Sequence, residues 1–337
     1  MPMASFFSNI VESIQSAKGA VGDYYQKVVT SLGDNVTISG REYRIHRLLG
    51  AGGFSLVYLV QDHEGQYYAL KKMECQLREQ VAHAHREIEN YRRFESDHII
   101  SMLDHATVTA PNGRQIVYLL LPFYRRGNLQ DIMDRRKAKN VYFSETRLLR
   151  MFLDVCDAVR VMHTHRDKPT SAEAAAKLMP WAHRDIKPGN ILLSDDGNKA
   201  VIMDLGSACP ARIPIHNKKE ALREQDIAAE HSSLPYRAPE LLDVKVDCVL
   251  DEKVDIWSLG CTLYAMAYGQ SPFDMSDSEQ GGSVTLAVMN GRVMFPKDHD
   301  RYSQPFKDFI LAMINPNVQE RPTIYEVISQ AKSLLNE

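Results

Sequence analysis

Eight consecutive residues, His183-Arg184-Asp185-Ile186-Lys187-Pro188-Gly189-Asn190, constrain this chain more than any other feature. They fix a carboxylate, a lysine two positions later and an asparagine five positions later. A carboxylate can accept a proton, an ammonium can neutralise negative charge, and an amide oxygen can ligate a metal ion. Nineteen residues after Asp185 comes Asp204, followed by Leu205 and Gly206. This second carboxylate is placed to hold Mg²⁺, so the spacing predicts a metal-assisted site.

A glycine-rich segment between two predicted strands, Gly50–Val57, reads GAGGFSLV. Glycines let backbone N–H groups approach a polyphosphate without a clash from Cβ. The segment is not a P-loop, because no Gly-Lys-Ser/Thr follows, and it is not a dinucleotide fingerprint, because a strand follows where that motif needs a helix. Alone it is a weak signal, since a glycine-rich hairpin is often only a turn.

Lys71 lies on the strand that follows, between Leu70 and Lys72 and close after Ala69. Such a lysine can be an edge residue whose ammonium reaches solvent. At this distance after a glycine-rich hairpin, we interpret it as a lysine that pairs with phosphates. That role needs an acidic anchor, which Glu87 on the next predicted helix can supply. A single glutamate on a helix is usually solvated, so Glu87 gains weight only within the set.

The elements divide the chain into two parts. Short runs rich in β-branched and aromatic residues predict three antiparallel strands from Arg41 onward, YRIHRLLG, SLVYLVQD and QYYALKKM, then a helix over Gln80–Phe94 and a strand over Ile116–Leu121. Beyond Gly127 helices dominate, and they are predicted over Arg147–His163, Lys218–His231, Val254–Tyr268 and Thr323–Leu335. The fold class is therefore α+β, with a small antiparallel β-sheet lobe before a larger helical lobe.

Composition excludes several function classes. The 337 residues carry a net charge of −3, whereas a general nucleic-acid binder has a basic excess. No run approaches about 18 apolar residues, so we expect no membrane-spanning segment. The N-terminus lacks the basic start and apolar core of a secretory signal. Five cysteines, an odd number without a CxxC pair, disfavour a disulfide scaffold or a zinc site and fit the cytoplasm.

Two segments stand apart from this pattern. Apolar residues recur every three or four positions in the first 36 residues, which predicts an amphipathic helix over Phe6–Val29, followed by a turn-rich linker over Ser31–Gly40. Thr164–Pro180 is polar and alanine-rich, and we interpret it as an insert that either forms two helical turns or remains a mobile surface loop. It contains a second His-Arg-Asp at 165–167, but the fifth residue after Asp167 is Ala172, so no metal-binding amide follows.

Two further motifs follow the motifs described above in the sequence. They are Ala238-Pro239-Glu240 and DIWSLG, which begins at Asp255. With this set, Arg41–Leu335 resembles a eukaryotic protein kinase. The strings GAGGFSLVYLV, LLLPFYRRGNL and MDLGSA further resemble the Numb-associated kinase family, in particular its lipid-anchored branch and the fungal vacuolar relatives. The resemblance implies a bilobal fold with a five-stranded sheet, an N-lobe over residues 41–123 and a C-lobe over 124–335. It also implies ATP and Mg²⁺ as cofactors and serine or threonine of proteins as substrates.

The resemblance also implies a role for each matching residue. Asp185 would accept the substrate proton, Lys187 would neutralise the γ-phosphate, and Lys71 would hold the other phosphates and pair with Glu87. Asn190 and Asp204 would ligate Mg²⁺. The residues implied to contact ATP are Leu49, Gly50, Ala51, Gly52, Gly53, Phe54, Ser55, Val57, Ala69, Lys71, Leu121, Pro122, Phe123, Tyr124, Asn190, Leu193 and Asp204.

Three further expectations concern structure and specificity. Glu240 and Arg321 match the family's buried ion pair, and Asp255 would anchor the catalytic loop from below. Lys187 and Ser233 indicate serine/threonine rather than tyrosine specificity, with the Ser233 hydroxyl bridging Asp185 and Lys187. From Ala208 to His231 there is no Ser, Thr or Tyr, so we predict a helix that keeps the activation segment ordered without phosphorylation.

The chain departs from the lipid-anchored branch at its start. Pro2 stands where myristoylation requires glycine, and no cysteine precedes Cys75. The helix over 6–29 could replace the anchor on a Golgi or vacuolar membrane, dock a partner, or pack on the chain's own kinase domain. We expect a monomer. The alternatives to an active kinase are a pseudokinase scaffold, which the complete motif set disfavours, and a small-molecule or lipid kinase, which the Ala-Pro-Glu segment disfavours.

Overall fold

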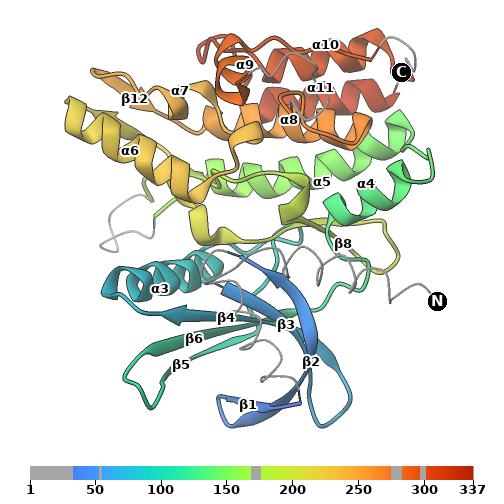
Figure 1. Ribbon diagram of the computed structural model, residues 1–337. Coiled ribbons are helices and arrows are strands. Elements are labelled where there is room, and N and C mark those ends of the chain that lie inside the picture. Colours follow the sequence, from blue (N-terminus) through green and yellow to red (C-terminus); the bar gives the residue numbers. More distant parts are fainter. Residues whose placement is uncertain (1–32, 53–54, 168–175, 275–282, 297–300, 337) are drawn as a thin grey trace. The chain divides into compact units, whose positions relative to one another are not determined.

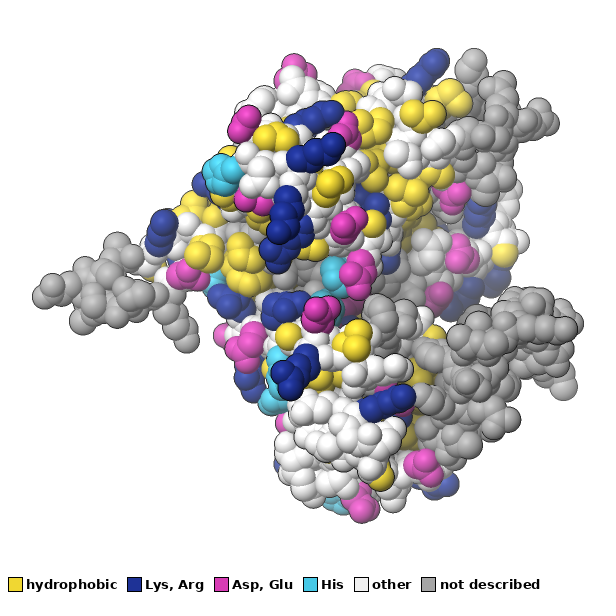
Figure 2. All heavy atoms as spheres, turned by 60° about the vertical axis from the view of Figure 1, so that its left-hand side comes forward, with side chains coloured by type: hydrophobic (Ala, Val, Ile, Leu, Met, Phe, Trp, Pro, Cys, Tyr) yellow, Lys and Arg dark blue, Asp and Glu magenta, His cyan; other side chains and the backbone are white. Residues whose placement is uncertain are grey.

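The computed structural model describes residues 33–52, 55–167, 176–274, 283–296 and 301–336. The predicted helix over 6–29, Gly53, Phe54 and the middle of the insert lie outside the described residues. The described residues form two compact units: the first comprises those up to Ala84 and Met102–Phe123, and the second comprises His85–Ser101 and those from Tyr124 onward. On the face that Figure 2 shows, basic and acidic side chains are intermingled, as the small net charge leads one to expect.

The first unit contains an antiparallel sheet (Figure 1). Its strands, in spatial order, are β1 (Asn35–Ile38), β2 (Arg41–Ala51), β3 (Ser55–Gln61), β4 (Tyr67–Cys75), β6 (Gln115–Pro122) and β5 (Asp104–Thr109). Each neighbouring pair is antiparallel. The predicted strands correspond to β2, β3, β4 and β6, which confirms the sheet lobe.

Strand β1 corrects two predictions. The interpretation of Ser31–Gly40 as a linker is wrong over Asn35–Ile38, because these residues pair with β2 and make the sheet six-stranded rather than five-stranded. Ser39 and Gly40 between the two strands have φ of 46° and 80°, the left-handed backbone of a tight hairpin turn. Ile38 is completely buried, so the strand anchors its end in the core. The strand has only four residues and lies among turn-forming residues, so the composition of Ser31–Gly40 predicted a linker instead of a strand.

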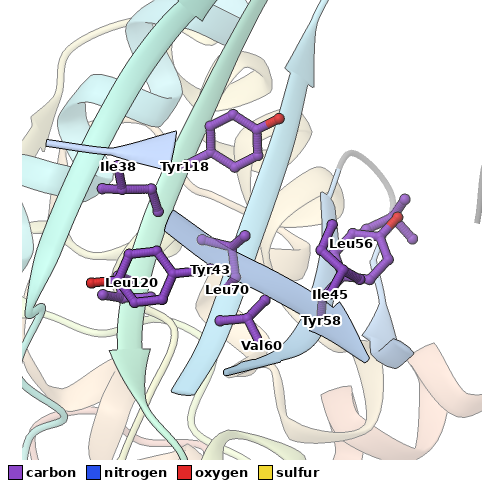
Figure 3. Packing of buried hydrophobic residues seen from close by; sticks show 9 residues of the cluster. All are labelled: Ile38, Tyr43, Ile45, Leu56, Tyr58, Val60, Leu70, Tyr118 and Leu120. Atoms are coloured by element: carbon purple, nitrogen blue, oxygen red, sulfur yellow. The ribbon is translucent and has the colours of Figure 1, made fainter. Parts of the chain in front are cut away.

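One face of the sheet carries the core of the first unit (Figure 3). The buried side chains on it are Ile38, Tyr43, Ile45, Leu56, Tyr58, Val60, Leu70, Tyr118 and Leu120. Side chains alternate along a strand, and residues paired across strands share a face. Val57 pairs with Lys71, and Ala69 pairs with Leu121. These four predicted ATP contacts therefore lie together on the opposite face of the sheet.

The second unit is mainly helical (Figure 1). Helix α3 (Arg78–Arg93) continues into it from the first unit, and the other helices are α4 (Leu129–Lys137), α5 (Glu145–His163), α6 (Lys218–His231), α7 (Pro239–Leu242), α8 (Lys253–Tyr268), α9 (Val284–Asn290), α10 (Gln304–Met313) and α11 (Ile324–Asn336). Every residue of α8 from Val254 to Ala267 is buried. A Cβ on Gly260 would lie 2.8 Å or less from Met313 and Ile314, so this glycine allows α10 to pack closely on α8.

The helix predictions hold closely. Residues 218–231 were predicted as a helix and form α6 with the same bounds. Asn217 caps it, since its side chain accepts the backbone N–H of Glu220, and Ser144 caps α5 in the same way. Within the part of the chain that the structure describes, no helix has the length and apolar character needed to cross a membrane.

Short strands connect the helices of the second unit. They form three two-stranded sheets, which are β7 (Trp181–Ala182) with β10 (Cys209–Pro210), β8 (Ile191–Leu193) with β9 (Ala200–Ile202), and β11 (Ile213–Ile215) with β12 (Cys248–Leu250). The β8–β9 hairpin begins just after Asn190 and ends just before Met203 and Asp204. It therefore returns the chain from the first predicted metal ligand to the second.

The ends of the insert are paired rather than loose. Arg166 and Leu178 form an antiparallel bridge, with hydrogen bonds of 3.0 Å from the N–H of Asp167 to the carbonyl of Lys177 and of 2.9 Å from the N–H of Met179 to the carbonyl of His165. The described residues from 176 to 180 are not helical, so the helical alternative is wrong there. Residues 168–175 of the insert lie outside the described residues.

Candidate active site

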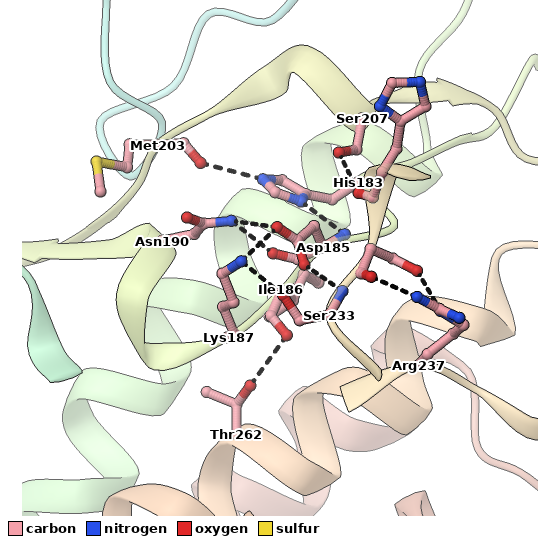
Figure 4. A network of polar contacts seen from close by, with 12 residues as sticks. His183, Asp185, Ile186, Lys187, Asn190, Met203, Ser207, Ser233, Arg237 and Thr262 are labelled. Carbon is pink, nitrogen blue, oxygen red and sulfur yellow. Dashed lines mark hydrogen bonds and ion pairs between the residues drawn. The ribbon is translucent and has the colours of Figure 1, made fainter. Parts of the chain in front are cut away.

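The carboxylate of Asp185 is at the centre of a polar network (Figure 4). Lys187 Nζ donates to Asp185 Oδ2 over 2.8 Å, and Asn190 Nδ2 donates to the same oxygen over 2.9 Å. The backbone N–H of Ser233 donates to Oδ1 over 2.9 Å. Asp185 is 9% exposed, so these contacts hold it in one orientation while leaving an edge open. Two of the predicted site residues, Lys187 and Asn190, therefore both contact the carboxylate of Asp185.

Asp255 supports this loop from α8. Its side chain is completely buried and accepts the backbone N–H groups of His183 and Arg184 over 2.8 and 2.9 Å, as well as His163 Nε2 over 3.0 Å. Burial acts to raise the pKa of Asp255, but the hydrogen bonds from His163 and Arg184 outweigh it, and the pKa is lowered. Arg184 has φ of 66°, a left-handed conformation that costs energy for a residue with a side chain. The two backbone hydrogen bonds to Asp255 stabilise that turn.

Asn190 and Asp204 come from adjacent backbone segments. The N–H of Met203 donates to the carbonyl of Asn190 over 2.9 Å, and His183 Nε2 lies 3.2 Å from the carbonyl of Met203. Asn190 uses its amide nitrogen for Asp185, which leaves its amide oxygen as the ligand atom. An amide oxygen and a carboxylate match the oxygen ligands that hard divalent cations prefer. The residues present therefore fit a divalent metal.

Ser233 joins the catalytic loop to the activation segment. Its hydroxyl lies 2.6 Å from Lys187 Nζ, while its backbone N–H binds Asp185. The contact to Lys187 is the predicted one, and the contact to Asp185 is made by the backbone instead of the hydroxyl. The neighbouring Ser232 accepts a hydrogen bond from Arg237 Nε over 2.7 Å, which fixes the same stretch of chain.

A second buried contact ties the activation segment to the catalytic loop. Arg184 Nη1 donates to Glu224 Oε2 on α6 over 3.0 Å, and the two side chains are 5% and 12% exposed. Ser207 Oγ donates to the carbonyl of His231, at the C-terminal end of α6, over 2.6 Å. The sequence predicted the helix but not Glu224 as the partner of Arg184. Glu224 lies near the middle of a charged, mostly solvated helix, and nothing in the sequence distinguishes it from the other charged residues there.

The predicted structural ion pair is present. Arg321 donates to both carboxylate oxygens of Glu240, over 2.7 and 3.1 Å. The Arg321 side chain is buried and also donates to the carbonyls of Lys253 and Asn315. A bidentate pair whose remaining donors are also used is the form of buried ion pair that retains its stabilisation.

In the first unit the glycine-rich segment forms the predicted hairpin. Gly50 pairs with Val57 and Ala51 pairs with Leu56, while the N–H of Gly52 donates to the carbonyl of Ser55 over 2.8 Å. Leu49 precedes this pairing on β2. A Cβ on Gly52 would lie 3.2 Å from Ser55 Oγ, so the turn leaves little room for a side chain there. The tip at residues 53 and 54 lies outside the described residues.

The remaining predicted site residues belong to both units. Lys71 belongs to the first unit and Glu87, which is 1% exposed, to the second. Pro122 and Phe123 end the first unit, and Tyr124 begins the second. Leu193 is buried on β8 of the second unit with Asn190 and Asp204 nearby in sequence. The ion pair of Lys71 with Glu87 and the ATP contacts therefore stay predictions.

Comparison with known proteins identifies the class. The protein kinase domain model matches residues 43–331, so the chain belongs to the protein kinase family. It is 36% identical to human "Serine/threonine-protein kinase 16", over 89% of this chain and 92% of that protein. It is 34% identical to "Serine/threonine-protein kinase ENV7" of Saccharomyces cerevisiae (89% and 93%) and to "Serine/threonine-protein kinase ppk13" of Schizosaccharomyces pombe (94% and 97%).

Within this family the chain is a serine/threonine kinase, an enzyme that uses ATP and a divalent metal, as the sequence predicted. The fold agrees, since an antiparallel sheet unit precedes a helical unit.

Proposed function

We propose that the chain transfers the γ-phosphoryl group of Mg²⁺·ATP to serine and threonine hydroxyls, with Asp185 as the catalytic carboxylate. The observation that carries the proposal is the asymmetry of its two oxygens. Oδ2 accepts from Lys187 and Asn190, whereas Oδ1 accepts only the N–H of Ser233 among the described residues. Since a carboxylate oxygen has two lone pairs, Oδ1 is the atom proposed to accept the proton of the substrate hydroxyl.

The other residues orient the reactants. When bound, ATP supplies the phosphoryl group, and Mg²⁺ neutralises the phosphate charge. Asn190 and Asp204 would hold the metal, and Lys187 would donate to the γ-phosphate. Lys71, anchored by Glu87, would hold the other phosphates, while the glycine-rich hairpin and the sheet face with Val57, Ala69 and Leu121 would cover the nucleotide.

We propose that the kinase is active without phosphorylation between Ala208 and His231. Arg184 already has a carboxylate partner in Glu224, and Ser233 is bonded to the catalytic loop. A phosphate that paired with Arg184 would have to displace Glu224. The ordered α6 thus supports an activation segment that is held in place by the chain's own residues.

The direct test is phosphorylation by the purified full chain in Mg²⁺ and ATP, with the modified sites mapped by mass spectrometry. We expect labelling on serine and threonine, including autophosphorylation, and none from the Asp185→Ala variant. Absence of transfer by the wild type, with ATP binding retained, would support a pseudokinase scaffold instead. Transfer to a lipid or small molecule but not to protein would support the third alternative.

We further propose a role in membrane trafficking at the Golgi or vacuole, within the Numb-associated branch. The support is the sequence resemblance and the apolar residues Phe6, Phe7, Ile10 and Ile14 of the predicted helix. Flotation with neutral liposomes compares the full chain with one that starts at Gly33. We expect only the full chain to float. Equal flotation, or a shortened chain that no longer folds, would favour packing of the helix on the kinase itself.

A further inference from the structure

A cavity of about 720 Å³ lies within the second unit, formed by α4, the start of α5 and the β8–β9 hairpin. Figure 1 shows these elements next to one another. Six cationic side chains line it, namely Arg125, Arg126, Arg135, Arg136, Lys139 and Arg147. Among the described residues that line it, none is an aspartate or glutamate. We call this cavity the arginine pocket.

The charge of the arginine pocket contrasts with the rest of the chain. The whole sequence has a net charge of −3, and the face in Figure 2 mixes both signs. Six cations around one concave space raise the local positive potential, because a low-dielectric wall concentrates the field. A cavity of this size can enclose a small ligand but is larger than a single phosphate needs.

Carbonyl groups orient three of these arginines, and the carboxylates of Asp196 and Asp131 attract Arg126 and Arg135 without a direct hydrogen bond. Arg126 Nε donates to the carbonyl of Asp195 over 2.7 Å, and Arg135 Nη2 donates to the carbonyl of Arg126 over 3.1 Å. Arg147 donates to the carbonyl of Gly197. Carbonyl acceptors fix the direction of a guanidinium fork but leave its unit charge in place.

The one carboxylate within ion-pair distance of a pocket cation, among the described residues, is a weak partner. Asp195 Oδ2 lies 3.7 Å from Arg125 Nε, and the two side chains are 58% and 73% exposed. Solvent screens a pair of this kind, so it contributes little. Asp195, Asp196 and Asp131 therefore offset part of the positive charge, while the lining itself holds six cations and no carboxylate among the described residues.

Arg136 provides an independent observation. Its guanidinium lies over the ring of Phe143 at 4.1 Å, and Nη2 donates to the carbonyl of Tyr142 over 2.7 Å. Its Nε is buried and has no hydrogen-bond partner in the described structure. Because this nitrogen is buried, it is not exposed to the cavity, and the contacts with Phe143 and Tyr142 fix the position of the guanidinium at the cavity wall.

Gly197 shows that the arrangement depends on close packing. Its φ is +77°, and a Cβ there would lie 3.0 Å from Arg126 Cζ. A glycine at this turn therefore admits the guanidinium of Arg126 from one side, while its carbonyl accepts Arg147 from another. The cations at the end of α4 could simply offset the helix dipole. That explanation does not account for Arg126 and Arg147, which reach the same cavity from a loop and from a different helix.

We propose that the arginine pocket binds a compact anion that carries several phosphate groups, such as a phosphorylated inositol. Guanidinium groups bind phosphate oxygens in a bidentate manner, and several groups arriving from three segments match several phosphates on one small scaffold. The apolar part of the wall, which includes Ile132 and Val141, leaves space for a carbon ring. The phosphates could belong to a soluble molecule or to a lipid headgroup, since both present the same chemistry.

The test is calorimetric titration of the full chain with inositol hexakisphosphate. A saturating non-hydrolysable ATP analogue is included because Leu193 lines the arginine pocket and is also a predicted ATP contact. The pocket variant is Arg135→Gln/Lys139→Gln, and the matched control is Arg44→Gln/Lys332→Gln, since all four side chains belong to exposed residues. We expect the pocket variant to bind about tenfold or more weakly, because each lost charged hydrogen bond is worth about that factor. The control should bind within about twofold of the wild type.

Three results would overturn the proposal: no binding by the wild type, equal weakening in both variants, or no weakening in the pocket variant. A peptide of aspartate and glutamate that bound as tightly as the phosphorylated inositol would also contradict it. Thermal unfolding checks that the variants fold, and Lys139→Glu gives a second variant should the double one be unstable.

A flotation arm separates the two sources of phosphate. Vesicles with a phosphoinositide are compared with phosphatidylcholine vesicles, using the full chain and the full-length pocket variant, so that the predicted helix contributes equally to both. Flotation that the pocket variant loses assigns a lipid headgroup. Binding of the soluble probe without flotation assigns a soluble phosphate. Failure of both arms contradicts the proposal.

Discussion

The tripeptide His-Arg-Asp occurs at 183–185 and again at 165–167, and the structure gives the two copies different surroundings. In the first copy, Asp255 accepts hydrogen bonds from two backbone N–H groups of the tripeptide. The carboxylate of Asp185 accepts hydrogen bonds from Lys187, Asn190 and Ser233. In the second copy Arg93 and His165 each lie 3.8 Å from Asp167 Oδ1, and the side chains of Asp167 and Arg93 are 37% and 32% exposed.

The second copy is nevertheless more ordered than a solvated insert. His165 packs edge-on against the ring of Phe94, and Asp167 is held by a backbone hydrogen bond to Lys177. Burial lowers the pKa of His165, and Arg93 adds to that effect. The comparison teaches that the tripeptide itself defines no site. The partners that distant segments bring to Asp185 separate the two copies.

The largest expected effect is loss of the Asp204 carboxylate, which we propose as a metal ligand of the site that contains the first copy. We predict that Asp204→Asn lowers phosphoryl transfer by about 10²-fold or more, as for other lost electrostatic groups in catalysis. Asparagine tolerates the left-handed backbone at this position, where φ is 64°, so the fold should persist. Asp247→Asn is the matched control, because Asp247 is an exposed aspartate with φ of 58°. Equal activity in the two variants would show that Asp204 holds no metal.

The next effect concerns Asp255, which anchors only the first copy. Asp255→Asn removes the charge and replaces one acceptor oxygen with an NH₂ donor. Either the N–H of Arg184, or the N–H of His183 together with His163, then loses its acceptor. We predict a loss of about 3 kcal/mol in the free energy of unfolding. Denaturant unfolding with and without the substitution measures this loss. A change below about 1 kcal/mol would mean that the left-handed turn at Arg184 does not depend on Asp255.

The same variant has a predicted dependence on pH. The pKa of Asp255 is lower in the folded state than in the unfolded chain. Its stabilisation is therefore complete above about pH 4, near the unfolded pKa, and is lost as the pH falls through the folded pKa. The difference in unfolding free energy between wild type and Asp255→Asn should shrink on acidification. A difference that grows on acidification would contradict the sign.

A smaller effect is expected at Glu224, the partner of Arg184. Glu224→Gln keeps the shape but removes the charge, and we predict a loss of about 1–2 kcal/mol in stability and a fall in activity of at most about tenfold. Phosphatase treatment of the wild type should leave activity within about twofold. Nearly complete loss of activity after phosphatase treatment would refute an activation segment that Glu224 holds in place without phosphorylation.

The smallest effect belongs to the second copy. Asp167→Ala breaks a long and partly exposed ion pair with Arg93, so we predict a change of less than about 0.5 kcal/mol in stability. Thermal unfolding measures it, with Asp243→Ala on the surface as the reference. A loss of several kcal/mol would mean that the insert contributes to the core of the second unit.

Local signals made much of the structure predictable. Residues 218–231 combine good helix formers with a capping asparagine just before them, and α6 has those bounds. The strands β2, β3 and β4 were predictable from short runs rich in β-branched and aromatic residues. The catalytic loop was predictable because its chemistry lies within eight residues.

The rest depended on contacts between distant segments. Strand β1 is stable because Ile38 reaches the core, which its turn-rich sequence does not reveal. Glu224 meets Arg184 from 40 residues away, and no spacing rule connects them. The arginine pocket combines residues from a loop, two helices and a hairpin turn, each of which alone looks like an ordinary charged surface.

The central claim is that the surroundings, and not the tripeptide, make one aspartate catalytic. The most direct measurement is the rate of phosphoryl transfer by Asp185→Asn and Asp167→Asn, with the same protein substrate at saturating Mg²⁺ and ATP. The account predicts a fall of about 10²-fold or more for Asp185→Asn and a rate within about twofold of the wild type for Asp167→Asn. Comparable losses in both variants, or a larger loss for Asp167→Asn, would contradict it.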